Sequence, residues 1–172
     1  MEGGRLSRSP MIAITVLRVL VGWHFLYEGI AKITSSSWSA AGYLRQARGP
    51  ASGVFKWLAA EPNLLGYADQ ITMWGLTIVG ILLILGLFTR LSALAAIGFL
   101  VMFYAANPPF VGYFYSLPSE GSYLIVNKNL VELGALVVIM LTGSGRFAGL
   151  DRIVHGLFTR RPRTATASPT TA

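Results

Sequence analysis

Three titratable side chains follow one another at four-residue intervals in the first apolar segment of this 172-residue chain. They are His24, Glu28 and Lys32, and this spacing places them along one side of an α-helix. Charged groups inside an apolar helix are unfavourable in lipid, so they commonly face the protein interior and bind ligands or carry protons. We therefore expect His24 and Glu28, together with Glu132, to be the catalytic residues of a proton-exchanging site.

Other polar side chains are predicted to reach the same depth, from helix ends and from a loop above them. We expect a ligand to be bound there by Lys32, Trp74, Asn107, Asn129, Arg45 and Arg48. The alternative is that the intramembrane ion pairs only fix helix packing. On the opposite side of the membrane, Arg18 and Asp151 are predicted to form a structural ion pair.

The sequence offers no pattern for a metal or a nucleotide. There is no cysteine, which excludes iron–sulfur ligation and thiolate zinc sites, and the HExxH, P-loop, dinucleotide and EF-hand patterns are absent. Haem held by two histidines would need His24 and His155, which are predicted near opposite faces. We expect no haem, iron–sulfur cluster, zinc or other metal ligand set.

The elements that position these residues are predicted from composition and apolar runs. Hydrophobic residues make up 53% of the chain and charged residues only 12%, about half the usual charged fraction, which excludes an ordinary soluble domain. Backbone groups in lipid must be hydrogen-bonded internally, so the apolar runs are expected to be helices. The prediction is an all-α integral membrane four-helix bundle, with helices at residues 11–33, 67–88, 91–106 and 123–141.

The connections and termini complete the predicted topology. The first long connection is expected to hold two short extracytoplasmic helices, at residues 40–48 and 52–60, and a tight turn at Thr89 and Arg90 joins the second and third spans. Eight Lys and Arg residues fall on one side, at 5, 8, 90, 146, 152, 160, 161 and 163, and four fall on the other, at 45, 48, 56 and 128. The positive-inside rule then places both termini in the cytoplasm.

This topology also accounts for the net charge of +7, because the basic residues lie in loops and tails rather than in a nucleic-acid-binding surface. Residues 1–158 are predicted to form a single four-helix transmembrane domain, followed by a disordered basic cytoplasmic tail at 159–172.

Several segments resemble one family. The run LRVLVGWHFLYEGIAK at residues 17–32 is similar to the opening signature of the DoxX family, and WSAAGYL followed by Gly49 and Pro50 resembles its DoxD-type branch. The segments LGLFTR at 85–90, NKNLVE at 127–132 and GLDR at 149–152 extend the resemblance in the expected order.

The resemblance implies a multi-pass protein of a prokaryotic cytoplasmic membrane. The DoxD-type branch includes the membrane subunit of thiosulfate:quinone oxidoreductase, which implies electron transfer from thiosulfate to quinone, with a second protein subunit or a homo-oligomer as partner. In that hypothesis His24 and Asn129 bind the quinone carbonyls, Glu28 and Glu132 exchange protons, and Lys32 with Arg45 or Arg48 attracts the anionic substrate. The alternatives are a non-enzymatic membrane anchor for a soluble redox or sulfur-transfer partner, and a small-solute or proton conduit.

Overall fold

The computed structural model describes residues 7–110, 112 and 124–158, and these residues are all-helical, with no β-strand among them. The helices are α1 (Arg8–Thr34), α2 (Ala41–Arg45), α3 (Ser52–Ala60), α4 (Pro62–Leu85), α5 (Thr89–Ala106), α6 (Lys128–Thr142), α7 (Ser144–Phe147) and α8 (Asp151–Phe158). Three of them, α1, α4 and α5, are long and apolar enough to cross a membrane. The 15 residues of α6 rise about 22 Å, which is less than a ~30 Å hydrocarbon core.

The predicted boundaries differ from the observed helices in instructive places. The second helix begins at Pro62 rather than at residue 67, because proline fits the first turn of a helix, where its missing N–H has no partner to lose. The helix predicted from residue 123 begins at Lys128, where the Asn127 side chain accepts a hydrogen bond from the Leu130 N–H. The tail predicted at 159–172 lies outside the described residues.

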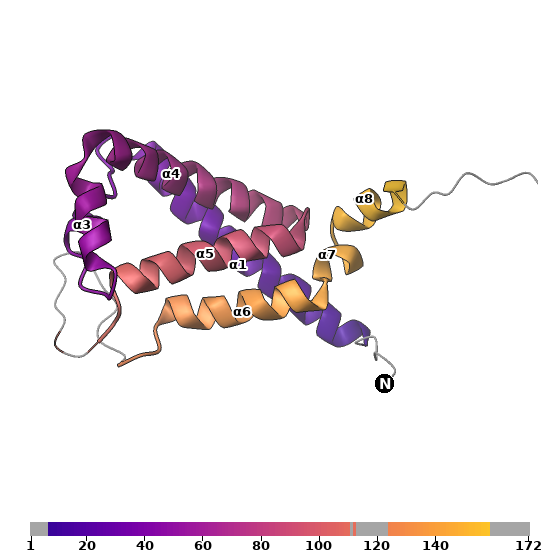
Figure 1. Ribbon diagram of the computed structural model, residues 1–172. Coiled ribbons are helices and arrows are strands. Elements are labelled where there is room, and N and C mark those ends of the chain that lie inside the picture. The colour runs from indigo at the N-terminus through magenta and orange to yellow at the C-terminus, as the bar shows by residue number, and fades with distance from the viewer. Residues whose placement is uncertain (1–6, 111, 113–123, 159–172) are drawn as a thin grey trace, which may run out of the picture.

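The longer helices α1, α4, α5 and α6 pack against one another in pairs, and the shorter ones lie at their two ends (Figure 1). Helix α1 packs along α4 and also contacts α6, while α5 packs against α6 and α4. Helices α2 and α3 lie at one end, called here the loop end. Helices α7 and α8 lie with the α4–α5 turn (Gly86 to Phe88) at the other, called here the turn end (Figure 1).

Glycines bring α1 and α4 into close contact. A Cβ atom on Gly29 would lie 2.6 Å from the backbone nitrogen of Thr77, and one on Gly80 would lie 2.4 Å from that of Leu26. Both distances are shorter than any real carbon contact, so the two helices approach this closely only because these positions lack side chains. The apolar core beside this contact includes Phe25, Leu83 and Leu136.

The loop end is closed by the α2–α3 segment. The Ala106 carbonyl, left without a partner at the end of α5, accepts hydrogen bonds from the N–H groups of Arg48 and Gly49, both at 3.0 Å. The Tyr43 hydroxyl donates to the Phe103 carbonyl at 2.8 Å. Backbone satisfaction therefore fixes this segment across the end of α5.

The turn end is built around one carboxylate. The Asp151 side chain accepts hydrogen bonds from the Phe88 N–H at 2.7 Å and the Thr89 N–H at 3.0 Å, which satisfies donors at the start of α5. The N–H groups of Leu150 and Asp151 donate in turn to the carbonyls of Leu85 and Gly86, at 3.0 and 2.9 Å. The α7–α8 junction is thus hydrogen-bonded to both sides of the α4–α5 turn.

This arrangement corrects the predicted position of the turn. Thr89 and Arg90 do not form it but begin α5, and the turn comprises Gly86 to Phe88. Gly86 ends α4 in the left-handed region at φ 64°, and Phe88 adopts the same region at φ 47°. A left-handed Phe is strained, and the Asp151 carboxylate compensates by binding its N–H.

Candidate functional site

The predicted catalytic residues His24 and Glu132 are in direct contact, although 108 positions separate them. His24 Nδ1 of α1 and Glu132 Oε1 of α6 lie 2.7 Å apart. The Glu132 side chain is 11% exposed and that of His24 is 40% exposed, so the pair lies at the edge of the contact between the two helices. The other ring nitrogen, Nε2, makes no hydrogen bond to any described residue.

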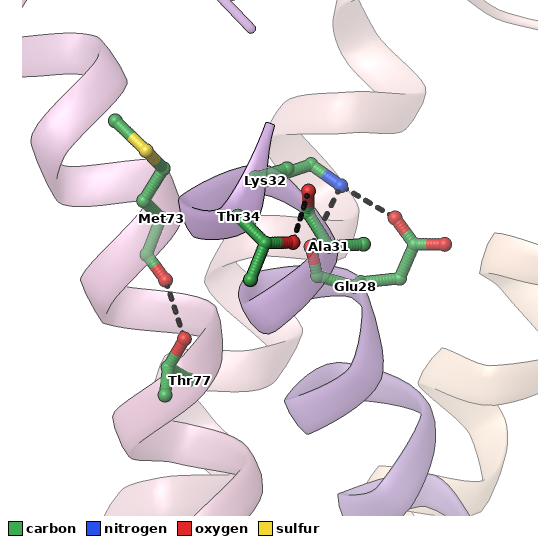
Figure 2. A network of polar contacts seen from close by, with 6 residues as sticks. All are labelled: Glu28, Ala31, Lys32, Thr34, Met73 and Thr77. Atoms are coloured by element: carbon green, nitrogen blue, oxygen red, sulfur yellow. Dashed lines mark hydrogen bonds and ion pairs between the residues drawn. The ribbon is translucent and has the colours of Figure 1, made fainter. Parts of the chain in front are cut away.

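The remaining predicted catalytic residue, Glu28, bonds within its own helix. Its Oε2 lies 2.5 Å from Lys32 Nζ, and the same amine donates to the Glu28 carbonyl at 3.1 Å. Figure 2 shows these two side chains meeting on the side of α1 away from Met73 and Thr77 of α4. The charges of Glu28 and Lys128 also act on His24 electrostatically, so the two pairs form one cluster of charges.

An open groove of about 330 Å³ runs between α1 and α6 beside the His24–Glu132 pair. Its walls are Leu17 and Val21 from α1 and Lys128, Val131, Glu132 and Ala135 from α6. The α6 residues recur at three- and four-residue intervals and therefore share one helix face. The groove is thus mainly apolar, with a carboxylate and an amine in its α6 wall.

This geometry can position a hydrogen-bond donor and transfer a proton. An ionised Glu132 accepts from the Nδ1–H of His24, which fixes the ring orientation and leaves Nε2 to act on a bound molecule. Histidine paired with a carboxylate is suited to general acid–base work near neutral pH. An apolar ring carrying a carbonyl oxygen fits the groove chemically, because the walls contact its carbon atoms and the polar pair is adjacent.

Trp74 is not brought to the cluster. It is 53% exposed, and it lies on the face of α4 opposite the buried residues Leu76 and Leu83. It is not among the residues that line the α1–α6 groove. Its predicted role as a ligand-binding residue stays a prediction.

Asn107 has a structural contact at the loop end. Its Nδ2 donates to the Tyr43 carbonyl at 3.2 Å, and its Oδ1 is buried without a partner. The Asp69 side chain of α4 likewise accepts from the Ala40 N–H at 2.7 Å. Both side chains hold the α2–α3 segment, so the predicted single polar level divides into a loop anchor and the His24–Glu132 cluster.

The other predicted ligand residues lie around the cluster rather than in the groove wall. Asn129 is half-buried on α6, and Arg45 and Arg48 are exposed on the segment that covers the loop end. Lys32 is held by Glu28 and lies 5.6 Å from the ring centre of Trp38. Their predicted roles toward a substrate stay predictions.

Arg18 and Asp151 meet at the turn end but do not form the predicted direct ion pair. Arg18 is 1% exposed, and its Nη2 donates to the Ala148 carbonyl at 2.6 Å. Asp151 is occupied by two backbone N–H groups, so each charged group has a separate partner and the two interact only through space. This arrangement is decided by the backbone N–H groups at the α4–α5 turn, which need a hydrogen-bond acceptor. Residue spacing in the sequence does not show that requirement.

The sequence did not predict which residues line the groove. Leu17, Val21, Val131 and Ala135 are ordinary apolar residues, and Lys128 is not among the predicted ligand-binding residues. The detectable signal was the three- and four-residue spacing of Lys128, Val131, Glu132 and Ala135 on one helical face. No such signal indicates which face of α1 lies opposite.

The comparisons agree with this architecture. The DoxX family model matches residues 13–107, more than half of the chain, and the protein belongs to the DoxX family. It is a membrane protein of that family with several apolar helices. No match was found among curated proteins or among solved structures.

Proposed function

We propose that this chain is the membrane subunit of a quinone-linked oxidoreductase of the DoxD-like type, and that the α1–α6 groove binds the quinone head group. The observation that carries the proposal is the apolar groove beside the His24–Glu132 pair. Quinones are apolar rings whose two carbonyl oxygens need hydrogen-bond donors, and they reach proteins from the bilayer. An open apolar groove with a nearby histidine has the matching chemistry.

Each polar residue has a defined task in this proposal. The quinone, when bound, supplies the acceptor for two electrons and two protons. His24 Nε2–H donates to a carbonyl oxygen, and Glu132 holds the ring through Nδ1 and balances the charge of a protonated imidazole. Glu28, which Lys32 keeps close, is the next carboxylate along α1 and replaces the proton on the His24–Glu132 pair.

The electron donor in the proposal is thiosulfate or a related sulfur anion. Two thiosulfate ions release two electrons as one tetrathionate forms, which matches the two electrons that one quinone takes up. Lys32, Arg45 and Arg48 give the loop end cationic groups that attract such an anion. A second protein subunit, or a second copy of this chain, completes the enzyme in this proposal.

The proposed membrane orientation follows from charge. Helix α6 joins α1, α4 and α5 as a fourth span, with its missing length supplied by residues before Lys128 or by local thinning of the bilayer. The turn end carries Arg8, Arg90, Arg146 and Arg152, and the flanking sequences add four more arginines. We therefore place the turn end and both termini in the cytoplasm of a prokaryotic cell.

A binding experiment tests the proposal without requiring the partner subunit. The purified protein in detergent is titrated with decylubiquinone, and binding is followed by calorimetry. The wild type is expected to bind, and Glu132→Gln and His24→Phe are expected to weaken binding at least about tenfold, the loss typical of a hydrogen bond to a charged group. Trp74→Phe, on the opposite face of α4, is the control and retains wild-type affinity.

Two results would contradict the proposal. One is the absence of quinone binding by the folded wild type, and the other is unchanged affinity in both site variants. If the two site variants insert into the membrane and stay monodisperse but lose quinone binding, the His24–Glu132 pair is a ligand site. Polar groups that only hold helices together would not give that result. If Glu28→Gln and Glu132→Gln merely destabilise the protein, the non-enzymatic anchor is the better account.

A further inference from the structure

A second cavity, of about 300 Å³, lies at the turn end, far from the His24–Glu132 pair. It is open to the surface and is lined by the start of α5 (Phe88, Thr89, Arg90 and Leu91), by Gly143 and Arg146 around α7, and by Asp151, Val154 and His155 of α8. Nothing in the proposed quinone chemistry uses it.

The charges around this cavity leave it positive. Arg90 and Arg146 are exposed in its wall, and the side chain of neither forms an ion pair or hydrogen bond with a described residue. The carboxylate in the wall, Asp151, is occupied, because its two oxygens accept from Phe88 and Thr89 and its charge interacts with the buried Arg18. The two arginines are therefore available to an anion from outside.

The rim of the cavity is apolar. Phe88 and Leu91 line it and are 54% and 66% exposed. Ile153 and Leu157 of α8 are also largely exposed and are four residues apart, so they form an apolar face on α8 outside the cavity wall. Such a short amphipathic helix, apolar on one side and basic on the other, is typical of the membrane interface.

The position of the cavity fits the same interface. Helix α5, one of the three candidate membrane spans, begins at Thr89 in the cavity wall. The cavity therefore lies where a span ends, at the depth of lipid headgroups, with its apolar rim toward the acyl chains. A phosphate beside two arginines and acyl chains beside Phe88 and Leu91 satisfy both sets of groups.

We infer that the turn-end cavity binds the phosphate headgroup of one anionic phospholipid through Arg90 and Arg146, with its acyl chains lying against Phe88 and Leu91. Arginine binds phosphate with two parallel charge-assisted hydrogen bonds, which distinguishes a site from general attraction to a charged surface. The apolar rim favours a lipid over free phosphate. Because the site is separate from the α1–α6 groove, the inference does not depend on the quinone proposal.

Native mass spectrometry of the full chain in detergent tests this inference. Phosphatidylglycerol and phosphatidylcholine with identical acyl chains are added in separate titrations. The wild type is expected to retain one phosphatidylglycerol and to prefer it at least about tenfold. The double variant Arg90→Gln/Arg146→Gln is expected to lose that preference.

A matched control removes the same charge elsewhere. Arg8→Gln/Arg152→Gln takes two exposed arginines from the turn end without touching the cavity wall, and it should change the affinity no more than about threefold. Leu91→Glu provides a second route, because it places a carboxylate in the cavity wall while both arginines stay. It should lower phosphatidylglycerol binding more than phosphatidylcholine binding, because only the anionic headgroup is repelled by the new carboxylate.

Three outcomes would overturn the inference. Equal losses in the two double variants would mean that the lipid senses only overall surface charge. Equal retention of the two lipids would remove the anionic preference. Binding of water-soluble glycerol phosphate as tightly as phosphatidylglycerol would make a soluble phosphate compound the ligand instead.

Discussion

The two polar regions of this protein use similar residues for different ends. At the turn end, Asp151 and Arg18 are bonded to backbone N–H and carbonyl groups. Between α1 and α6, His24 and Glu132 are bonded to each other beside an open groove. Charged side chains that bond to the backbone hold the course of the chain at the turn. A pair of side chains in which one ring nitrogen has no hydrogen bond can instead bind a ligand and move a proton.

Burial follows the same division. Arg18 is almost fully buried against Gly86, where a Cβ atom would lie 2.7 Å from Nη1 of the guanidinium. His24 retains 40% of its side-chain surface. We therefore expect substitutions at the turn end to act on stability and substitutions at the groove to act on binding.

The largest expected effect tests the turn end directly. Gly86→Ala forces a Cβ into the left-handed region and against Arg18, which should lower the free energy of unfolding by about 3 kcal/mol. Gly98→Ala is the control, because it lies in a helix with open space around it and should raise stability by roughly 0.5–1 kcal/mol. Unfolding by SDS in mixed micelles measures both, and equal effects would show that the turn end is not a special constraint.

Loss of the turn-end carboxylate should be the next largest effect. Asp151→Ala removes the acceptor for the N–H groups of Phe88 and Thr89 and should lower the free energy of unfolding by about 2 kcal/mol. The same unfolding assay measures it, with calorimetric quinone binding as the second readout. Weakened quinone binding in a fully folded Asp151→Ala protein would contradict the separation of the two regions.

Glu132→Gln should show the opposite pattern. Glutamine still accepts a hydrogen bond from His24, so the free energy of unfolding should fall by only about 1 kcal/mol. Quinone binding should nevertheless weaken about tenfold, because the carboxylate no longer balances a protonated imidazole. A stability loss as large as that of Gly86→Ala, with quinone binding retained, would show that the His24–Glu132 pair only holds α1 and α6 together.

The smallest expected effect is at the Glu28–Lys32 pair. The two residues are four positions apart on one helix, and Glu28 is partly exposed, so Glu28→Gln should change the free energy of unfolding by only about 0.5 kcal/mol. In vesicles that contain the complete enzyme, with thiosulfate as the reductant, it should slow the proton uptake that accompanies quinone reduction while leaving calorimetric quinone affinity near wild type. Unchanged proton uptake would remove Glu28 from the proposed proton path.

The sequence by itself determined the helical class and the three long apolar helices. These follow from local chemistry, because apolar runs in lipid must satisfy their backbone internally. The four-residue spacing also placed His24, Glu28 and Lys32 on one side of α1. Depth and spacing together correctly placed Glu132 near them.

Tertiary structure alone decided which polar residues meet. Trp74 lies on α4 outside the wall of the α1–α6 groove, and Asn107 is engaged by the Tyr43 carbonyl. Asp151 binds the backbone of the α4–α5 turn instead of Arg18 because the N–H groups at the start of a helix need an acceptor. Which polar side chains meet depends on the rotation of each helix about its axis and on backbone groups far away in the chain. Local residue spacing specifies neither of these.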